Sequence, residues 1–254
     1  MGTVAITGSA SGIGAAVRAR LEAQGDRVVG VDVRGAEIEA DLSNAAGRAA
    51  AVDGIRAAAK DGLDRLVLCA GLGPHVEDPA QIASVNYFGS VDLLDALLPD
   101  LGGRPQAAAV AICSNSAQLG DFQEHPYVLA LLDGDEAKAR DLIATEPGYI
   151  AYGGSKHALC RAIRRRAAAW GAANVRLNGV CPGATVTPLL QASLDHPFYG
   201  KAIDALAIPL QRKGEADEIA GVVAFLLGPG AGYIHGSILY VDGGCDAAVQ
   251  PDRF

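Results

Sequence analysis

Residues 3–32 read TVAITGSASGIGAAVRARLEAQGDRVVGVD, and this stretch decides the fold. A short β-rich run leads into the glycine-rich segment at 7–14, which is followed by an alanine-rich stretch of helical period. A helix is expected from about Gly12 to Gln24, because apolar side chains recur there on one face. A second apolar run then ends at Asp32. Strand, glycine turn, helix and strand in this order predict two parallel strands joined by a crossover helix.

The same alternation continues to the end of the chain. Further strands are expected at 37–41, 65–70, 107–113, 174–180 and 237–243, and further helices at 44–60, 85–99, 151–171 and 215–227. The longer strand runs are continuously apolar, which is typical of a parallel sheet covered on both faces. We therefore expect an α/β fold, a doubly wound Rossmann fold whose seven-stranded parallel sheet is flanked by helices. Its ligand crevice should lie at the carboxyl ends of the strands.

Two segments depart from this regular pattern. Only four residues separate Asp32 from the short strand at 37–41, too few for a crossover helix, so a mere turn is expected there. Residues 118–150 form a long connection rich in acids, Pro and Gly, which we interpret as an insertion. Within it, DGDEAKARDLIA at 133–144 has the composition of a helix. We expect residues 1–254 to form one catalytic domain.

Composition excludes several classes of protein. The chain of 254 residues has 21 basic and 29 acidic side chains, a formal net charge of −8, which gives no electrostatic reason to bind nucleic acid or an anionic membrane. Its five cysteines are widely scattered and the histidines show no ligand spacing, so neither disulfides nor a metal site is expected. The first seven residues read as a strand rather than a signal peptide, and no apolar run approaches a membrane span. A cytoplasmic protein is expected.

The glycine-rich segment predicts a dinucleotide site. Gly8 permits a tight turn, Gly12 lets backbone amides approach a pyrophosphate, and Gly14 lets helix and strand pack closely. Asp32 ends the second strand, where its carboxylate can accept hydrogen bonds from ribose hydroxyls and repel the 2′-phosphate of NADP. NAD is therefore favoured, although Arg34 could pair with that phosphate. The alternative interpretation is a structural glycine turn.

A second set of polar residues predicts acid–base chemistry. Tyr152 and Lys156 stand four residues apart on an expected helix and share one face. A tyrosine hydroxyl is a weak base at neutral pH, but a neighbouring ammonium and a positive nicotinamide favour its ionised form. Ser114 directly follows a buried strand, where it can hydrogen-bond a substrate oxygen. Asn86 could anchor a water that relays protons, or serve as an ordinary packing or capping amide. Thr185 follows a strand end and could bond the nicotinamide carboxamide.

Together with these residues, LCAG at 68–71, VN at 85–86, YGGSK at 152–156 and PGATVTP at 182–188 resemble the short-chain dehydrogenase/reductase family, in its branch without an added substrate domain. The resemblance covers essentially the whole chain. It implies a catalytic tetrad in which Tyr152 is the acid/base, Lys156 favours its ionised form and holds the nicotinamide ribose, Ser114 orients the substrate and Asn86 supports a proton relay. The expected cofactor-binding residues are Gly8, Ser11, Gly12, Ile13, Gly14, Asp32, Asp41, Leu42, Gly71, Tyr152, Lys156, Pro182, Gly183 and Thr185.

Two departures from the family pattern stand out. LCAG replaces a common NNAG, and this should be tolerated because those amides mainly tie the sheet together. The separation of Ser114 from Tyr152 is 152 minus 114, or 38 residues, which is unusually long. The extra residues precede a helix that many members use for a four-helix interface. We therefore expect a homodimer whose interface is altered by the insertion.

The sequence also narrows the substrate. Residues 186–210 are rich in apolar side chains and are interpreted as a substrate flap for an apolar alcohol or ketone, although each side chain could equally be ordinary helix packing. The flap residues considered are Leu189, Leu190, Leu194, Phe198, Tyr199, Ile203, Leu206 and Ile208. Within the family, VDVRGAEIEADLS, LVLCAGLGP and PGATVTPLLQ are similar to the bacterial 3α-hydroxysteroid dehydrogenase/carbonyl reductase group, with coniferyl (aryl-allylic) alcohol dehydrogenases as the alternative. A noncatalytic NAD-binding regulator is disfavoured by the intact Tyr and Lys.

Overall fold

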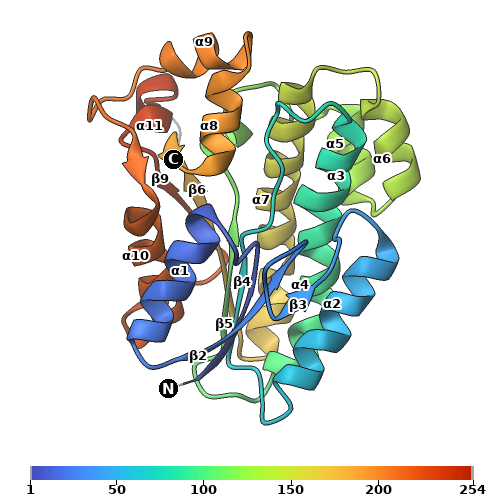
Figure 1. The fold of residues 1–254 in the computed structure, drawn as a ribbon, viewed down its shortest axis with the longest axis vertical. Helices are drawn as coiled ribbons and strands as arrows, with labels where there is room; N and C mark the ends of the chain where they lie inside the picture. Colours follow the sequence, from blue (N-terminus) through green and yellow to red (C-terminus); the bar gives the residue numbers. More distant parts are fainter. Residues whose placement is uncertain (1, 253–254) are drawn as a thin grey trace.

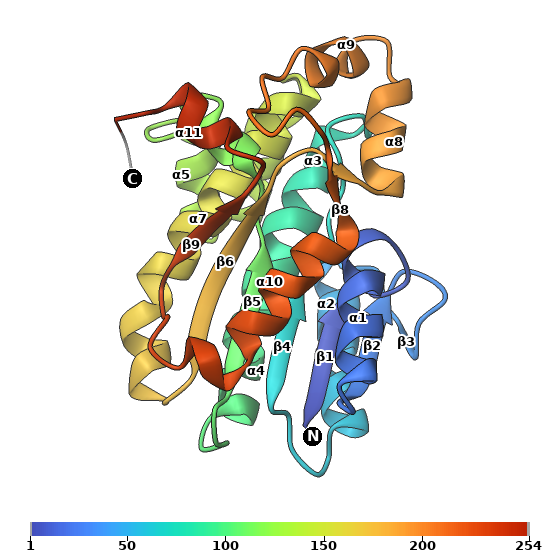
Figure 2. The ribbon, with the colours of Figure 1, turned by 90° about the vertical axis from the view of Figure 1, so that its left-hand side faces the viewer.

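A computed structural model describes residues 2–252 and shows the expected seven-stranded parallel sheet. The strands run in the order β3-β2-β1-β4-β5-β6-β9 (Figures 1 and 2). Their bounds are β1 Thr3–Thr7, β2 Arg27–Asp32, β3 Ile38–Glu39, β4 Arg65–Leu68, β5 Ala108–Ile112, β6 Arg176–Pro182 and β9 Ile238–Val241. The predicted fold class is confirmed.

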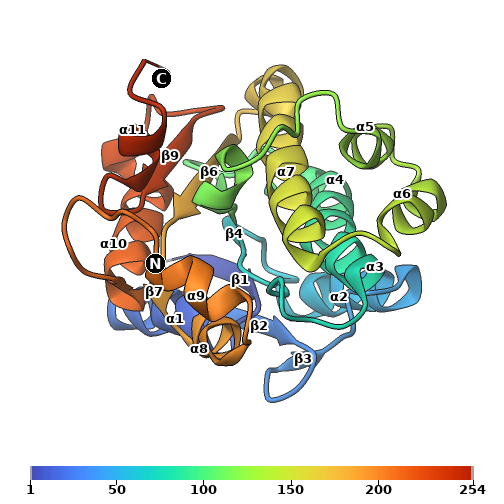
Figure 3. The ribbon, with the colours of Figure 1, turned by 90° about the horizontal axis from the view of Figure 1, so that it is seen from above.

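Helices cover both faces of the sheet. Helices α1 (Gly12–Ala23) and α10 (Ala216–Leu227) lie on one face, and α2 (Ala45–Ala58), α4 (Gly89–Leu101) and α7 (Gly148–Ala172) lie on the other (Figures 1 and 3). Successive side chains of a strand point to opposite faces. Val4 and Ile6 of β1 accordingly enter the core under α1 and α10, whereas Ala5 enters the core under α2, α4 and α7. All three are fully buried, so the sheet has no solvent-facing side at its centre.

The strand order reverses between β1 and β4. From β1 the chain moves outward to β2 and β3, and then returns to place β4 on the opposite side of β1. Residues 33–37 join β2 to β3 without a helix, as the sequence predicted. A reversal of this kind opens a crevice at the carboxyl ends of the two flanking strands.

The predicted helix at 85–99 begins earlier than expected. Its first turn is α3 (Pro79–Ala83), which continues through a π-helical turn at Ser84–Phe88 directly into α4. The start is set by Asp78, whose side chain accepts a hydrogen bond from the Ala80 amide (2.9 Å), and by Pro79, which suits the first helical position. The sequence prediction was wrong here because it followed the apolar run and overlooked this cap.

The segment 118–150 carries two helices of its own. Helix α6 (Glu136–Ile143) lies in the predicted segment, whereas α5 (Pro126–Leu132) was not predicted. Helix α5 packs against α7 and α6 packs against α3, so both lie outside the helical layer on that side of the sheet (Figure 3). Tyr127 of α5 is fully buried, and its hydroxyl donates a hydrogen bond to the carbonyl of Ala151 (3.2 Å).

A second, two-stranded sheet joins the two ends of the segment that includes residues 186–210, which was expected to be a substrate flap. Strands β7 (Thr185–Val186) and β8 (Gly214–Glu215) pair in parallel, and the chain between them forms α8 (Pro188–Asp195) and α9 (Tyr199–Asp204). These helices lie over the carboxyl ends of the large sheet (Figure 2). The chain ends with a short 3₁₀ turn at Pro229–Ala231, β9 and α11 (Cys245–Val249). None of the helices within residues 2–252 combines the length and apolar composition that a membrane span requires.

Arg48 of α2 fastens the inserted α6 to the rest of the fold. Its guanidinium is 4% exposed and pairs with Glu136 of α6 (2.5 Å) and Asp92 of α4 (2.7 Å). It also donates a hydrogen bond to the carbonyl of Leu42 (3.2 Å), at the carboxyl-end crevice. One buried cation therefore joins three helices to the chain that follows β3.

We expect Arg48→Met to lower the free energy of unfolding by about 3 kcal/mol, because it leaves two partly buried carboxylates without their partner. The matched control is Arg56→Met, which removes the exposed pair with Asp100 and should cost at most about 1 kcal/mol. Urea unfolding followed by circular dichroism measures both. Equal losses in the two variants would contradict the role assigned to Arg48.

Candidate active site

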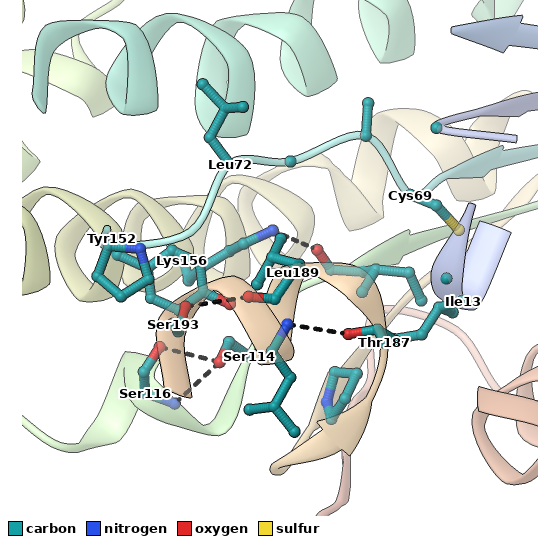
Figure 4. A pocket seen from close by; sticks show the side chains of 18 of the residues that line it. Ile13, Cys69, Leu72, Ser114, Ser116, Tyr152, Lys156, Thr187, Leu189 and Ser193 are labelled. Carbon is teal, nitrogen blue, oxygen red and sulfur yellow. Dashed lines mark hydrogen bonds between the residues drawn. The ribbon is translucent and has the colours of Figure 1, made fainter. Parts of the chain in front are cut away.

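One cavity of about 820 Å³ opens at the carboxyl ends of the strands, where the strand order reverses. It is lined by the β1–α1 loop, the ends of β2, β4, β5 and β6, one face of α7, and the α8–α9 segment. Every site residue predicted from the sequence lines this cavity except Asn86. Figure 4 shows Ser114, Tyr152 and Lys156 within it, with Leu189 of α8 close by.

The glycine-rich loop between β1 and α1 depends on glycine at two positions, because any side chain there would collide with the backbone. A Cβ at Gly14 would lie 2.0 Å from the carbonyl oxygen of Gly8, so α1 could not approach β1 with any other residue there. Gly8 has φ +67°, and a Cβ on it would lie 2.7 Å from the Ala70 amide nitrogen. Ser11 precedes α1 without capping it through its side chain, so the first amides of the helix stay available at the cavity. This cradle fits a pyrophosphate.

Two acidic residues lie at the ribose and adenine end predicted from the sequence. The carboxylate of Asp32 accepts hydrogen bonds from the amides of Ala10 (3.0 Å) and Val33 (2.7 Å), which fix it beside the glycine loop. Arg34 is exposed and lies outside the cavity lining. The Ser43 amide holds the pKa of Asp41 below its ordinary value by hydrogen bonding, so Asp41 stays ionised at the turn into α2. Its neighbour Leu42 is buried against the same end of the cavity.

Lys156 and Ser114 are anchored at the end of β5. The Lys156 ammonium is 4% exposed and donates a hydrogen bond to the carbonyl of Ile112 (2.8 Å), which leaves two of its hydrogens for a ligand. The Ser114 oxygen accepts hydrogen bonds from the amide (3.2 Å) and hydroxyl (2.9 Å) of Ser116. Its own hydroxyl proton is therefore available to an oxygen in the cavity. Tyr152 lies one helical turn before Lys156 on α7 and lines the same cavity.

Asn86 lies behind the cavity wall rather than in it. It is fully buried in the π-helical turn, its side-chain oxygen accepts from the Leu72 amide (2.7 Å), and its side-chain nitrogen donates to the Leu72 carbonyl (3.1 Å). This two-way pairing braces the chain after β4, as the packing interpretation expected. A Cβ at Gly71 would lie 3.3 Å from Asn86 Oδ1 and 3.5 Å from Lys156 Nζ, so the three residues form one corner of the site.

The end of β6 is equally constrained. A Cβ at Gly183 would lie 2.8 Å from Asp242 Cα, so the chain turns there close to the strand end of β9. Thr185 is buried and its hydroxyl donates a hydrogen bond to the carbonyl of Gly183 (3.0 Å). Pro182, Gly183 and Thr185 all line the cavity at this point.

The α8–α9 segment lies closed over the cavity. His75 Nδ1 and Ser193 Oγ are 2.9 Å apart, which ties α8 to the chain after β4. Burial lowers the pKa of His75, so this contact involves a neutral imidazole near pH 7. Six of the apolar residues named from the sequence line the cavity, but Leu194 and Ile208 do not, and the Ile208 side chain packs against Gly243 instead.

Several cavity residues were not found from the sequence. The chain after β4 contributes Leu72 and Pro74, and the insertion contributes Leu119, Phe122 and Tyr149. Their apolar side chains carry no motif, and only the position of their segments after β4 and β5 could have indicated them. They add to the apolar side of the cavity opposite the glycine loop.

Comparison with known proteins agrees with this geometry. A profile described as short chain dehydrogenase matches residues 2–130, and one described as enoyl-(acyl carrier protein) reductase matches residues 141–246. The chain belongs to the short-chain dehydrogenase family. The family resemblance seen in the sequence is thus confirmed, and the protein is an oxidoreductase.

Two relatives match nearly the whole chain. The chain is 49% identical over 257 residues to the 3-alpha-hydroxysteroid dehydrogenase/carbonyl reductase of Comamonas testosteroni, which covers 100% of both chains. It is 30% identical over 251 residues to the coniferyl-alcohol dehydrogenase of a Pseudomonas species, covering 95% of each. A crystal structure of a 3-alpha-hydroxysteroid dehydrogenase from Pseudomonas sp. B-0831, complexed with NADH, superposes with a TM-score of 0.97 at 45% identity, covering 99% of this chain and 100% of that one.

Proposed function

We propose that this short-chain dehydrogenase is an NAD-dependent 3α-hydroxysteroid dehydrogenase/carbonyl reductase, which interconverts a secondary or aromatic alcohol and its carbonyl in the cytoplasm. The observation that carries the proposal is one cavity in which Ser114, Tyr152 and Lys156 meet the glycine loop and an apolar wall. The likeness in sequence to the Comamonas enzyme over the whole chain supports the same substrate class.

The residues of the cradle fit a dinucleotide. The first amides of α1 would hold the pyrophosphate, Asp32 the adenosine ribose, Asp41 and Leu42 the adenine, and Thr185 the nicotinamide carboxamide. Lys156 would donate its remaining hydrogens to the nicotinamide ribose. The anion at Asp32 and the exposed position of Arg34 favour NAD over NADP. When bound, NAD supplies the acceptor or donor of a hydride.

Residues of the chain transfer the proton and hold the substrate oxygen by hydrogen bonding. Ser114 donates its free hydroxyl proton to that oxygen and fixes it against Tyr152. In the oxidation direction Tyr152 accepts the hydroxyl proton of the alcohol, and in reduction it returns a proton to the developing alkoxide. Lys156, one helical turn from Tyr152 on α7, places a positive charge in the same cavity. Asn86 holds Gly71 and Leu72 in place and supports passage of the proton beyond Lys156.

The cavity wall opposite the glycine loop suits a flat apolar substrate. Apolar side chains from the insertion and from the flap line the same cavity: Leu119, Phe122, Tyr149, Leu189, Phe198 and Leu206. No basic side chain besides Lys156 is among the described residues that line the cavity, so a phosphorylated or acidic substrate lacks a partner. A coniferyl (aryl-allylic) alcohol is the second candidate, because the chain also resembles a coniferyl-alcohol dehydrogenase along its length.

The proposal is tested by following NAD reduction with androsterone, coniferyl alcohol and simple aromatic alcohols. We expect the highest kcat/KM with the steroid, and Tyr152→Phe should lower kcat by about 10²–10⁴-fold, because general acid–base catalysis is lost. NADH binding, measured by fluorescence, should survive in this variant. Tyr149→Phe, one turn earlier on α7, should change KM more than kcat. High residual turnover in Tyr152→Phe would overturn the assigned base, and a preference for coniferyl alcohol would select the second candidate.

Cofactor choice provides a separate prediction. We expect Asp32→Ser to raise the ratio of kcat/KM with NADP to that with NAD by at least about tenfold, equivalent to 1.4 kcal/mol, because the charge that repels the 2′-phosphate is removed. Glu39→Ser is the matched control, since Glu39 lies one strand further out and does not line the cavity. A wild-type enzyme that prefers NADPH would defeat the assignment of NAD.

We further propose a homodimer whose interface avoids the α4–α7 face. Helices α5 and α6 cover part of that face (Figure 3), whereas β9 is an edge strand with half-exposed side chains. Phe225 of α10 is half-exposed, and Tyr233, in the turn between α10 and β9, is fully exposed, so this part of the chain offers exposed aromatic side chains as well as an edge strand.

Light scattering should therefore give the mass of a dimer for the wild type and of a monomer for the double variant Phe225→Glu/Tyr233→Glu. Leu142→Glu, on the exposed side of α6, serves as control and should remain dimeric. Dissociation by Leu142→Glu alone, or a tetramer built on α4 and α7, would refute this interface.

A further inference from the structure

Three cysteines meet directly beneath the active-site cavity. Cys113 follows β5, Cys160 lies on α7 and Cys181 lies in β6. Their Sγ atoms all lie within 4.8 Å of one another, and those of Cys160 and Cys181 are 3.8 Å apart. Cys113 and Cys181 are buried, and Cys160 is partly buried. Neither the site residues nor the proposed reaction uses these thiols.

The spacing of the sulfurs matches a metal site. A metal–thiolate bond is about 2.3 Å long, so three thiolates around one ion lie about 3.8 Å apart in tetrahedral geometry and about 4.0 Å apart in a trigonal plane. The Cys160–Cys181 distance already has this value, and the two distances from the Cys113 sulfur, neither above 4.8 Å, need only a small rotation of its side chain. A disulfide would instead require one pair to close to about 2.05 Å.

The surroundings of the three cysteines give a metal ion access to the sulfurs and place a positive charge next to them. Cys113 lines the cavity, so an ion can reach the cluster from there without unfolding the chain. Lys156 donates a hydrogen bond to the carbonyl of Ile112, the residue before Cys113, so its positive charge lies beside the cluster. Three thiolates with one divalent ion carry a net charge of −1, which the nearby Lys156 ammonium balances. A buried charge needs such a partner, so a divalent ion suits the site better than a monovalent one.

The cluster and the active site share a helix face. Tyr152, Lys156 and Cys160 follow one another at intervals of four residues on α7 and therefore form one stripe. Cys113 is the residue immediately before Ser114, and Cys181 is the residue immediately before Pro182. An ion held by the three sulfurs would therefore be bound by residues adjacent to Ser114 and Pro182. Its charge would also act on the Lys156 ammonium, which is expected to hold the nicotinamide ribose.

We propose that Cys113, Cys160 and Cys181 form a binding site for one thiophilic divalent metal ion of the Zn²⁺ or Cd²⁺ class, and that occupancy of this site stops turnover. Binding displaces the thiol protons to solvent and forms three metal–sulfur bonds, with no change of oxidation state. The inhibition rests on the proposed dehydrogenase function, whereas the binding does not.

The test is a titration of the full-length, reduced and metal-free protein with Cd²⁺, followed by the ultraviolet thiolate-to-cadmium charge-transfer band. We expect saturation at one ion per chain, with release of protons on binding. Cys113→Ser, Cys160→Ser and Cys181→Ser should each weaken binding by at least about tenfold, equivalent to 1.4 kcal/mol. Cys69→Ser and Cys245→Ser are matched controls, because both remove a free thiol outside the cluster and should leave the titration unchanged.

Turnover is followed in parallel with whichever alcohol proves active. NAD reduction by the wild type should cease with the same midpoint as the absorbance titration, and Cys160→Ser should resist Cd²⁺. Absence of the band at one equivalent, or its persistence in Cys160→Ser, would overturn the site. Loss of two thiols as a Cys160–Cys181 disulfide on exposure to air, without metal binding, would overturn it in favour of a redox pair. Full activity at saturating Cd²⁺ would overturn the proposed inhibition but not the metal site. Lack of activity with every alcohol would count against the proposed function, and the charge-transfer band would still show whether the metal site exists.

Discussion

The contact between Gly14 and the carbonyl of Gly8 constrains everything that lies above the sheet. Because a Cβ at Gly14 would lie 2.0 Å from that oxygen, the first turn of α1 can pack this closely on the loop after β1 only if position 14 has no side chain. The close start brings the first amides of α1 to the point where the strand order reverses. Asp32, one strand away, is then held by the amide of Ala10 in the same loop. The nucleotide end of the cavity follows from this one close approach.

The other end of the cavity depends on a single crossover. The chain leaves β5 at Ser114, passes through the insertion and α7, and returns in β6, which lies beside β5. Lys156 on α7 donates to the last carbonyl of β5, so the crossover helix is fixed relative to the strand end by a buried charge-assisted hydrogen bond. Ser114 and Tyr152 therefore line the same cavity although they lie 38 positions apart in the sequence. The insertion adds chain between Ser114 and Tyr152, yet both residues still line one cavity.

Sequence reasoning succeeded where the signal was local. The long strands of the large sheet were found because their apolar runs are continuous, and the glycine loop because its residues adjoin one another, whereas the two-residue strands β7 and β8 were not predicted. The start of α3 was missed although Asp78 and Pro79 carried a capping signal, whereas α5 begins with His125, an uncommon cap. The pairing of Asn86 with the backbone of Leu72 joins residues 14 apart through a π-helical turn that no periodicity indicates. The apolar wall from the insertion depends on how α5 and α6 pack, which the sequence alone does not determine.

The three cysteines also show that sequence spacing does not reveal contacts between residues far apart in the chain. Local spacing rules find metal ligands that are close in sequence, and by those rules the cysteines are unrelated, since they lie 47 and 21 residues apart. The fold makes them neighbours because β5 and β6 are adjacent strands and α7 is the helix that connects them. In a right-handed βαβ unit the crossover helix packs onto the sheet, so residues on its sheet-facing side at the right height meet residues at the ends of both strands. Tyr152 and Lys156 reach the cavity wall beside Ser114 by the same geometry, so this crossover creates the proposed acid–base site and, one helical turn further along α7, the thiol cluster.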